Sequence, residues 1–303
     1  MDRRETAGGK ADLREADTRG TDLREADTRG TDTREADMPE MDMRQIVGSH
    51  DILLVTLDTL RYDVAAELAG AGLLPNLLPP GVSWERRHSP GSFTYAAHAA
   101  VFAGFLPTPV TPGPHPRLFA ATFPGSETTA EHTWVFDAPD LPTGLARAGY
   151  HTVCVGGVGF FNKLTPLGSV LPALFAESHW APEFGVTSPS SLEHQIDCAA
   201  AAVRGRREPV FLFVNVSALH QPNHFYLPGA TGDSLETHAA ALRYVDRHIG
   251  RLYALMRRPC LVIVCSDHGT AYGEDGHVGH RIGHEVVWTV PYAQFILERH
   301  ATL

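Results

Sequence analysis

From Ile46 onward, the chain alternates short apolar runs with stretches in which apolar residues recur at helical spacing. Short runs rich in branched residues predict buried parallel strands at 52–57, 151–156, 210–216, 260–265 and 293–297. Helical spacing predicts helices at 63–68, 141–148, 192–203 and 234–256. Strands separated by helices form a mostly parallel sheet that is covered on both faces. The predicted fold class is therefore α/β, a three-layer α/β/α sandwich with a mostly parallel, mixed central sheet.

The first 45 residues follow a different pattern, built from five-residue units such as ADLRE and ADTRG. These units resemble the signature of the pentapeptide-repeat family, which forms a right-handed β-helix. The units are few, and their central position holds Leu13 and Leu23 but elsewhere mostly threonine. So little apolar surface does not offset an ordering cost of about 1–2 kcal/mol per residue. We therefore predict a disordered, mixed-charge tail over 1–45 and a folded domain over 46–303, with a docking or oligomerising tail as the alternative.

Composition limits the classes of partner. The 303 residues carry a formal net charge of -10, whereas nucleic-acid binders usually present a basic surface. No apolar run approaches the roughly 20 residues of a membrane span, and the charged N-terminus does not read as a signal peptide. The four cysteines form no CxxC pair and are expected to be reduced thiols. These features predict a soluble cytoplasmic protein without nucleic-acid or membrane partners, and they leave its oligomeric state open.

Polar side chains directly follow three of the predicted strands, namely Asp58, His220 and the pair Asp267 and His268. In parallel sheets, ligands bind in the crevice at the carboxyl ends of the strands. The segment 266–285 also holds four histidines and four acidic residues, interrupted by glycines. Carboxylates and imidazoles favour Zn²⁺ or Mn²⁺, while carboxylates and hydroxyls also suit Mg²⁺ or Ca²⁺. We therefore predict a divalent-metal site at this edge of the sheet.

Thr94 stands at the start of a predicted helix that begins near Tyr95. A hydroxyl in that position lies where a phosphate or sulfate group can rest on free backbone N–H groups. The alternative is that Thr94 only caps the helix. The residues alone leave both interpretations open.

Four segments resemble, in order, the motifs of the alkaline phosphatase and sulfatase-like superfamily. TLDTLRYD is similar to its first metal-binding motif, and LPNLLPPGVSWERRHSPGSFTYAAHAAVFAGFLP to its nucleophile region. LHQP resembles the histidine–proline substrate loop, and SDHGTAYGEDGHVGH resembles the C-terminal metal motif. The resemblance runs from about Ile46 to the C-terminus. It implies an alkaline phosphatase-like fold and a metal-dependent hydrolase that acts on a small-molecule anionic ester.

Residue by residue, the resemblance implies that Asp58, Asp267 and His268 coordinate a divalent metal. Thr94 would be both a fourth ligand and the nucleophile, because metal binding lowers the pKa of a hydroxyl. A covalent intermediate would form and then be released by water. His220 would donate a proton to the leaving group.

The resemblance also suggests a second metal, because relatives hold one with an Asp-xxx-His pair and a later histidine. This chain offers His220 and His224 at that interval, with His280 or His277 downstream. The aspartate is replaced by histidine, so one or two ions remain open. Lys163 stands where sulfatases place a lysine on the substrate anion, with a surface lysine as the alternative.

The chain departs from sulfatases around Thr94, since TYAAH lacks the convertible residue, proline and arginine of the C/S-x-P-x-R motif. Its Thr-x-x-x-His spacing is closer to the phosphodiesterase branch, which favours phosphate or phosphonate esters. The alternatives are a sulfuryl hydrolase, a phosphoryl transferase or mutase, and a non-catalytic metal-binding homologue. Arg61 is expected to pair with a carboxylate, and the proline-rich loop 108–126 to border the site.

Overall fold

The computed structural model describes residues 41–104 and 140–298. The predicted tail, apart from its last few residues, and the predicted loop 108–126 lie outside these ranges. The folded unit described below begins at Asp42. None of the helices in the described part of the chain is both long and apolar enough to cross a membrane.

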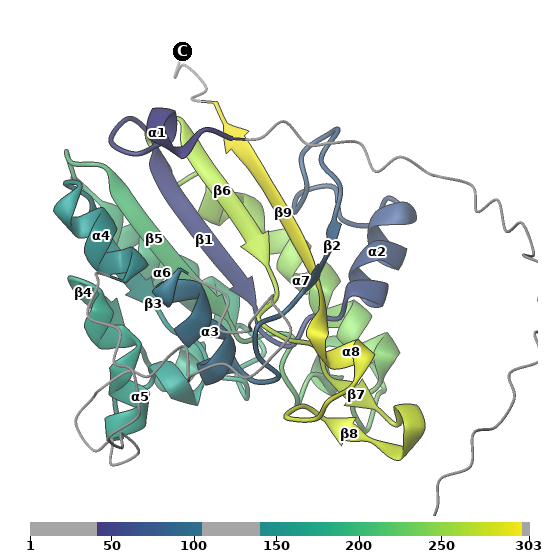
Figure 1. Ribbon diagram of the computed structural model, residues 1–303. Helices are drawn as coiled ribbons and strands as arrows, with labels where there is room; N and C mark the ends of the chain where they lie inside the picture. The colour runs from purple at the N-terminus through teal and green to yellow at the C-terminus, as the bar shows by residue number, and fades with distance from the viewer. Residues whose placement is uncertain (1–40, 105–139, 299–303) are drawn as a thin grey trace, which may run out of the picture. The chain divides into compact units, whose positions relative to one another are not determined.

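A seven-stranded mixed sheet forms the middle layer, in the order β2-β9-β6-β1-β5-β3-β4 (Figure 1). Strands β6, β1, β5, β3 and β4 are parallel, whereas β9 runs antiparallel to both β6 and β2. The strand bounds are β1 Asp51–Leu57, β2 Glu85–His88, β3 His151–Val155, β4 Glu177–His179, β5 Val210–Val216, β6 Cys260–Cys265 and β9 Thr289–Leu297. A separate hairpin pairs β7 (Ala271–Tyr272) with β8 (Val278–Gly279). The predicted mostly parallel, mixed sheet is confirmed.

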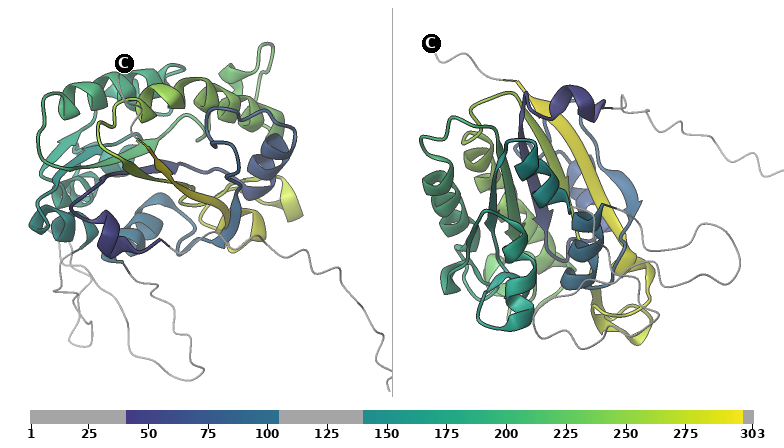
Figure 2. Two further views of the ribbon diagram at one scale, coloured as in Figure 1. Left: turned by 90° about the horizontal axis from the view of Figure 1, so that it is seen from above. Right: turned by 60° about the vertical axis from the view of Figure 1, so that its left-hand side comes forward.

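Helices cover both faces of this sheet, so the three-layer prediction is also confirmed (Figure 2). Helices α2, α6 and α7 pack on one face, and α3 and α4 lie on the other. The helix bounds are α1 Met43–Ile46, α2 Tyr62–Gly70, α3 Thr94–Ala103, α4 Leu141–Arg147, α5 Pro166–Val170, α6 Ser191–Val203, α7 Leu235–Tyr253 and α8 Glu285–Trp288. Short 3₁₀ helices lie at Gly159–Phe161, Pro172–Leu174, Pro182–Phe184, His224–Tyr226 and Glu274–Gly276.

The two faces of the central strands carry different side chains. On the α7 face, Leu53, Val55 and Leu57 of β1 belong to the main apolar core. On the α3 face, an aromatic cluster forms around Phe213, whose ring centroid lies 5.1 Å from that of Phe102. Because side chains alternate along a strand, the polar Thr56 lies on this second face, near the carboxyl end of β1. The second face therefore leads toward the polar edge of the sheet.

Predicted and observed boundaries agree best for fully buried strands. β5 and β6 begin and end where their apolar runs do, and β1 starts one residue earlier, at Asp51. α7 begins after Ser234, which forms a capping box with Thr237. β2 and β4 lie at the two edges of the sheet and were not predicted. All four cysteines are free, as expected.

Candidate metal centre

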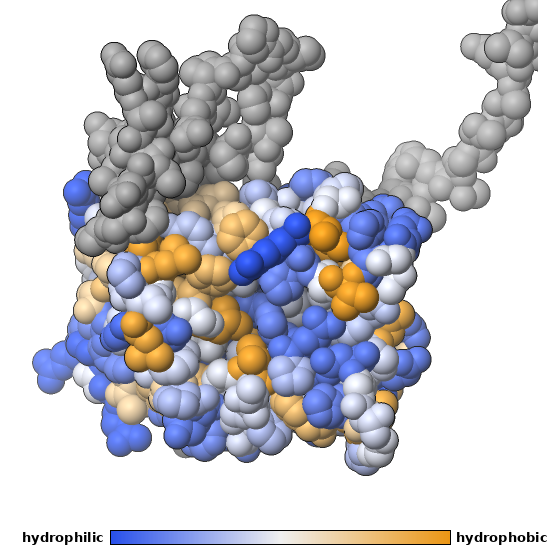
Figure 3. All heavy atoms as spheres, turned by 90° about the horizontal axis from the view of Figure 1, so that it is seen from below, coloured by the Kyte–Doolittle hydropathy of each residue, from blue (hydrophilic) through white to orange (hydrophobic). Residues whose placement is uncertain are grey.

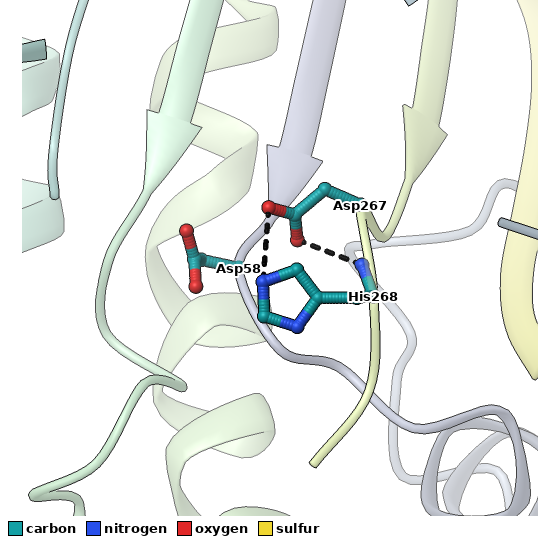
Figure 4. Close-up of side chains that lie close together, drawn as sticks. All are labelled: Asp58, Asp267 and His268. Atoms are coloured by element: carbon teal, nitrogen blue, oxygen red, sulfur yellow. Dashed lines mark hydrogen bonds and ion pairs between the residues drawn. The ribbon is translucent and has the colours of Figure 1, made fainter. Parts of the chain in front are cut away.

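Asp58 and Asp267 lie at the carboxyl edge of the sheet because each follows a central parallel strand (Figure 4). The backbone register between these strands pairs Thr56 of β1 with Cys265 of β6. The backbone N–H of Thr59 donates to Asp267 Oδ1 at 3.3 Å, which ties the two segments together. The strand order therefore brings together carboxylates that are more than two hundred residues apart in sequence.

Asp58, Asp267 and His268 form a buried cluster whose ligand atoms all lie within 4.8 Å of one another. Asp58 Oδ1 and Asp267 Oδ2 are buried without a hydrogen-bond partner in the described structure. Burial and the nearby charge of Asp58 raise the pKa of Asp267 well above its ordinary value. Two close buried carboxylates repel each other, and a divalent cation between them relieves that repulsion. The orphaned oxygens therefore fit a cation.

The imidazole of His268 is oriented by its own backbone neighbourhood. Its Nδ1 donates to the carbonyl oxygen of Gly269 at 2.9 Å, which leaves the lone pair on Nε2. Nε2 lies 3.5 Å from Asp267 Oδ2, so this nitrogen faces the carboxylates of the cluster. A backbone carbonyl that fixes one ring nitrogen in this way is the usual partner of a metal-binding histidine.

Thr94 is the first residue of α3 and is almost fully buried, with 3% of its surface exposed. Its Oγ1 lies 3.3 Å from Asp58 Oδ2 and 3.3 Å from His268 Nε2. The structure therefore brings together all four residues predicted to hold the metal. Two carboxylates, an imidazole and a hydroxyl are a donor set that suits Zn²⁺ or Mn²⁺.

His98 forms a hydrogen bond to Thr94, and it was not assigned a role from the sequence. Its Nδ1 donates to the backbone oxygen of Thr94 at 2.8 Å, and its Nε2 lies 3.0 Å from the hydroxyl of Thr56. Burial lowers the pKa of His98 to about 4, so the ring is neutral near pH 7. The Thr-x-x-x-His spacing was the signal for this contact, because residues four apart share a helix face.

Asn215 is a second supporting residue without a predicted role. Its side-chain amide nitrogen donates to Asp58 Oδ2 and to Thr56 Oγ1, both at 3.3 Å. Its Oδ1 accepts from the backbone N–H of Val158 at 3.1 Å. One buried side chain thus connects the metal-ligand candidate Asp58 with the loop that follows β3.

A cavity of about 350 Å³ lies over Thr94. The polar side chains that line it are Thr94, Thr165, His220, His280 and Arg281. Apolar and hydrophilic side chains lie next to one another on the face at the carboxyl ends of the strands (Figure 3). Arg281 also has no predicted role, because nothing in the sequence says which side chain of a glycine-rich loop faces a cavity.

The four histidines proposed for a second metal separate into two groups. His220 and His280 both line the cavity, and their rings contact each other edge to face, with centroids 5.4 Å apart. His224 does not line this cavity, and its Nδ1 lies 3.2 Å from Asp233 Oδ1. His277 is exposed, and its ring contacts His284 rather than the cavity. The second metal therefore stays a prediction, with only half of its proposed ligands together.

Lys163 and Arg61, the two basic residues singled out in the sequence, differ in whether their contacts match the prediction. The ammonium of Lys163 donates to the carbonyl of Ser178 at 2.8 Å, and the residue does not line the cavity over Thr94. The structure thus does not bring Lys163 to the site. Arg61 is buried and pairs with Asp63 and Glu274, as expected for a residue that fixes the first motif.

The layered α/β/α architecture is the fold of a solved protein of the alkaline phosphatase superfamily from Vibrio parahaemolyticus, which is 17% identical with a TM-score of 0.53 over 83% of this chain and 60% of that one. The chain belongs to the sulfatase family, whose family model, described as Sulfatase, matches residues 50–292. Members of this superfamily are hydrolases and transferases that act on phosphate or sulfate esters. None of the curated proteins compared with the chain matches it.

Solved structures share the fold at low sequence identity. The C-terminal periplasmic domain of phosphoethanolamine transferase EptC from Campylobacter jejuni is 14% identical, with a TM-score of 0.56 over 82% of this chain and 80% of that one. The EptC domain from Escherichia coli in complex with Zn is 12% identical, with a TM-score of 0.53 over 82% and 73%. The lipoteichoic acid synthase LtaP from Listeria monocytogenes is 13% identical, with a TM-score of 0.53 over 85% and 67%.

At these identities the likeness shows the fold alone. Two of these neighbours are periplasmic domains, so they give no support to the predicted cytoplasmic location, which stays a prediction.

Proposed function

We propose that this protein is a metal-dependent hydrolase of phosphate or phosphonate esters, with Thr94 as its nucleophile. The observation that carries the proposal is the position of Thr94 Oγ1. It lies 3.3 Å from both Asp58 Oδ2 and His268 Nε2, and the same residue lines a cavity of about 350 Å³. A nucleophile must face both an activating group and the substrate, and Thr94 is the residue with both contacts.

Asp58, Asp267, His268 and Thr94 would hold one divalent ion, with Zn²⁺ or Mn²⁺ preferred over Mg²⁺ or Ca²⁺ because an imidazole is among the ligands. When bound, the ion lowers the pKa of the Thr94 hydroxyl and offsets negative charge at the substrate. The buried carboxylates hold the ion in place, and His268 keeps its Nε2 lone pair free because Nδ1 is bonded to Gly269.

In the first step, Thr94 gives its hydroxyl proton to water, and Oγ1 forms a bond to phosphorus while the bond from phosphorus to the alcohol oxygen breaks. His220 would give that oxygen its proton, since it lines the same cavity. His220 Nδ1 donates to the carbonyl of Gln221 at 2.5 Å, so Nε2 is the nitrogen that exchanges the proton. In the second step, His220 Nε2 would take a proton back from water, whose oxygen bonds to phosphorus. The bond to Oγ1 breaks, Thr94 regains its proton from water, and phosphate or phosphonate leaves.

The chain's own sequence supports phosphate or phosphonate over sulfate. No residue beside Thr94 can be converted to formylglycine, because TYAAH contains neither cysteine nor serine. A threonine oxygen would attack a phosphorus centre directly, and loose phosphoryl transfer depends mainly on positioning and charge stabilisation.

Steady-state turnover tests the proposal. The protein is loaded with Zn²⁺ or Mn²⁺, and the 4-nitrophenyl esters of phosphate, phenylphosphonate and sulfate are compared. We expect turnover of the phosphorus esters, loss of about 10³-fold or more in Thr94→Ala, and partial activity in Thr94→Ser. Acid quenching followed by mass spectrometry is expected to find phosphorus on the peptide that contains Thr94.

Each alternative has its own outcome in this experiment. Turnover of the sulfate ester alone would indicate a sulfuryl hydrolase, and metal binding without turnover would indicate a non-catalytic homologue. Transfer to an added alcohol in preference to water, followed by phosphorus NMR, would indicate a transferase. Full activity in Thr94→Ala would remove Thr94 from the mechanism.

A further inference from the structure

The cavity over Thr94 is lined by two chemically different sets of side chains, named below the polar wall and the apolar wall. The polar wall carries His220, His280 and Arg281. The apolar wall consists of Val158, Phe160, Leu167 and Val186. A pocket with this division binds a ligand that is itself divided into a polar and an apolar part.

Phe160 is the central side chain of the apolar wall. Its ring lies 6.1 Å from that of Phe93 and 5.8 Å from that of Tyr95, measured between centroids. Phe93 and Tyr95 flank Thr94 in the sequence, and Phe160 lines the same cavity as Thr94, so an aromatic ring borders the cavity that the proposed nucleophile faces. A flat apolar group bound to an atom at Thr94 would therefore meet the face or edge of Phe160.

Apolar side chains continue from this wall to the surface. Leu167, which lines the cavity, is 40% exposed, and Leu164 is 72% exposed. Large exposed apolar side chains are ordinary when single, but Leu167 itself lines the cavity, and Leu164 lies three residues before it in the chain. Contact with an apolar group would remove this surface from water.

The loop that carries the apolar wall is tightly folded. A Cβ atom added to Gly168 would lie 2.9 Å from the carbonyl oxygen of Gly159, and the N–H of Lys163 donates to the carbonyl of Gly168 at 3.0 Å. Thr165 Oγ1 accepts from the N–H of Gly168 at 3.0 Å. These short-range contacts hold the wall in place, so binding need not order it.

Arg281 brings a positive charge to the polar wall. Its guanidinium lies 5.3 Å from the ring centroid of Phe93, and its backbone N–H donates to Ser92 at 2.8 Å. Within the described residues, no carboxylate forms an ion pair with this guanidinium, although the chain as a whole is acidic. An unpaired guanidinium in a cavity is suited to a phosphorus-bound oxygen anion.

We infer that the substrate is an ester whose alcohol part is apolar, preferably aromatic. That part lies against Phe160, and Arg281 holds a charged oxygen of the phosphorus acid. The inference rests on the proposed function, because it takes Thr94 as the point at which phosphorus is held. It makes Phe160 and Arg281 the residues that determine specificity.

Two phosphonates that differ only in their apolar group test the inference without turnover. Phenylphosphonate and methylphosphonate are titrated into the metal-loaded protein by calorimetry. We expect phenylphosphonate to bind about tenfold more tightly or better. Phe160→Ala should remove this preference and leave the affinity for methylphosphonate unchanged, and Phe160→Leu should retain part of it. Arg281→Ala should weaken both ligands by about tenfold, whereas the surface control Arg251→Ala should weaken neither.

Equal affinity of the wild-type protein for the two phosphonates would overturn the inference, even if the Phe160 variants do not fold. An equal loss for both ligands in folded Phe160→Ala would also overturn it. Turnover of 4-nitrophenyl phosphate by the same preparation separates the two proposals. Turnover without a preference for phenylphosphonate overturns only this inference. A preference for phenylphosphonate without turnover supports a cavity with a polar and an apolar wall, and it contradicts the proposed hydrolysis.

Discussion

Asp58 and Asp267 face one another because the strands that precede them, β1 and β6, are parallel neighbours in register. Both carboxylates are almost completely buried, and each has one oxygen without a hydrogen-bond partner in the described structure. Such an arrangement is unfavourable for the metal-free fold and favourable for a bound cation. The same two residues therefore link metal affinity to stability.

Asp58→Asn is expected to lower the affinity for Zn²⁺ or Mn²⁺ by about 100-fold or more, because it removes an anionic ligand. The same change removes a charge that repels Asp267, so the melting temperature of the metal-free protein should not fall. Calorimetric metal titration and thermal melts with a chelator measure the two effects. Asp197→Asn, on the surface and paired with Arg251, is the control. Unchanged metal affinity in Asp58→Asn would rule out Asp58 as a ligand.

His98→Phe tests whether His98 positions Thr94. Phenylalanine keeps an aromatic ring next to Phe161 and Phe213 but removes both hydrogen bonds. The Thr94 carbonyl and the Thr56 hydroxyl then each lose one hydrogen bond, which costs about 0.5–1.5 kcal/mol each in unfolding free energy.

We expect His98→Phe to lower kcat and to leave KM nearly unchanged, because the side chains that line the cavity stay the same while the nucleophile shifts. Urea unfolding and steady-state kinetics measure both. A variant that is destabilised but keeps the wild-type kcat would leave His98 with a purely structural role.

The sequence predicted the buried part of the fold well and its edges poorly. β1, β5 and β6 are continuous apolar runs because both of their faces are covered. β2 has the sequence ERRH, whose side chains are mostly exposed, so no apolar pattern marks it. Its pairing with β9 joins segments that are far apart in the chain, and the local sequence does not encode such a contact.

The site was predictable where chemistry and strand position coincide. Asp58, Asp267 and His268 follow strands that proved adjacent, and Thr94 begins the helix beside them. His224 shows the opposite case, because its spacing from His220 suggested a shared ion. Asp233, nine residues further along, lies 3.2 Å from its Nδ1 instead. Spacing along the chain does not say which of two nearby partners a loop side chain will meet.

Gly269→Ala is expected to disrupt the metal centre through the backbone. An added Cβ would lie 1.9 Å from the carbonyl oxygen of Val286, and Gly269 supplies the carbonyl that orients His268. We expect a loss of at least about 2 kcal/mol in unfolding free energy and weaker metal binding.

Gly250→Ala is the matched control for this change. Gly250 lies inside α7, and nothing stands within 4 Å of the position of an added Cβ. Alanine should stabilise the helix there by about 0.5–1 kcal/mol. Urea unfolding of both variants gives the comparison, and equal effects from the two substitutions would contradict the proposed close packing of Gly269.

His238 makes stability depend on pH away from the metal centre. It is completely buried in α7, with Nδ1 3.0 Å from the hydroxyl of Tyr272 and no partner for Nε2 in the described structure. Burial, with a smaller contribution from the charge of Arg61, lowers its pKa from 6.5 to about 3. The unfolded chain binds a proton below about pH 6.5, whereas the folded chain does so only near pH 3.

The stabilising contribution of neutral His238 is therefore complete above about pH 6.5 and declines as the pH falls toward 3, by up to roughly 1.4 kcal/mol per pH unit. His238→Gln and His238→Asn cannot take up this proton, so their unfolding free energies should fall less steeply with acid than that of the wild type. Urea unfolding of the metal-free proteins between about pH 4.5 and 7.5 measures the difference. Both substitutions are expected to lower the unfolding free energy at neutral pH. Proton uptake by His238 is reported only by the slope of the unfolding free energy against pH. Parallel curves for the wild type and both variants would show that His238 is protonated in the folded state as readily as in the unfolded one.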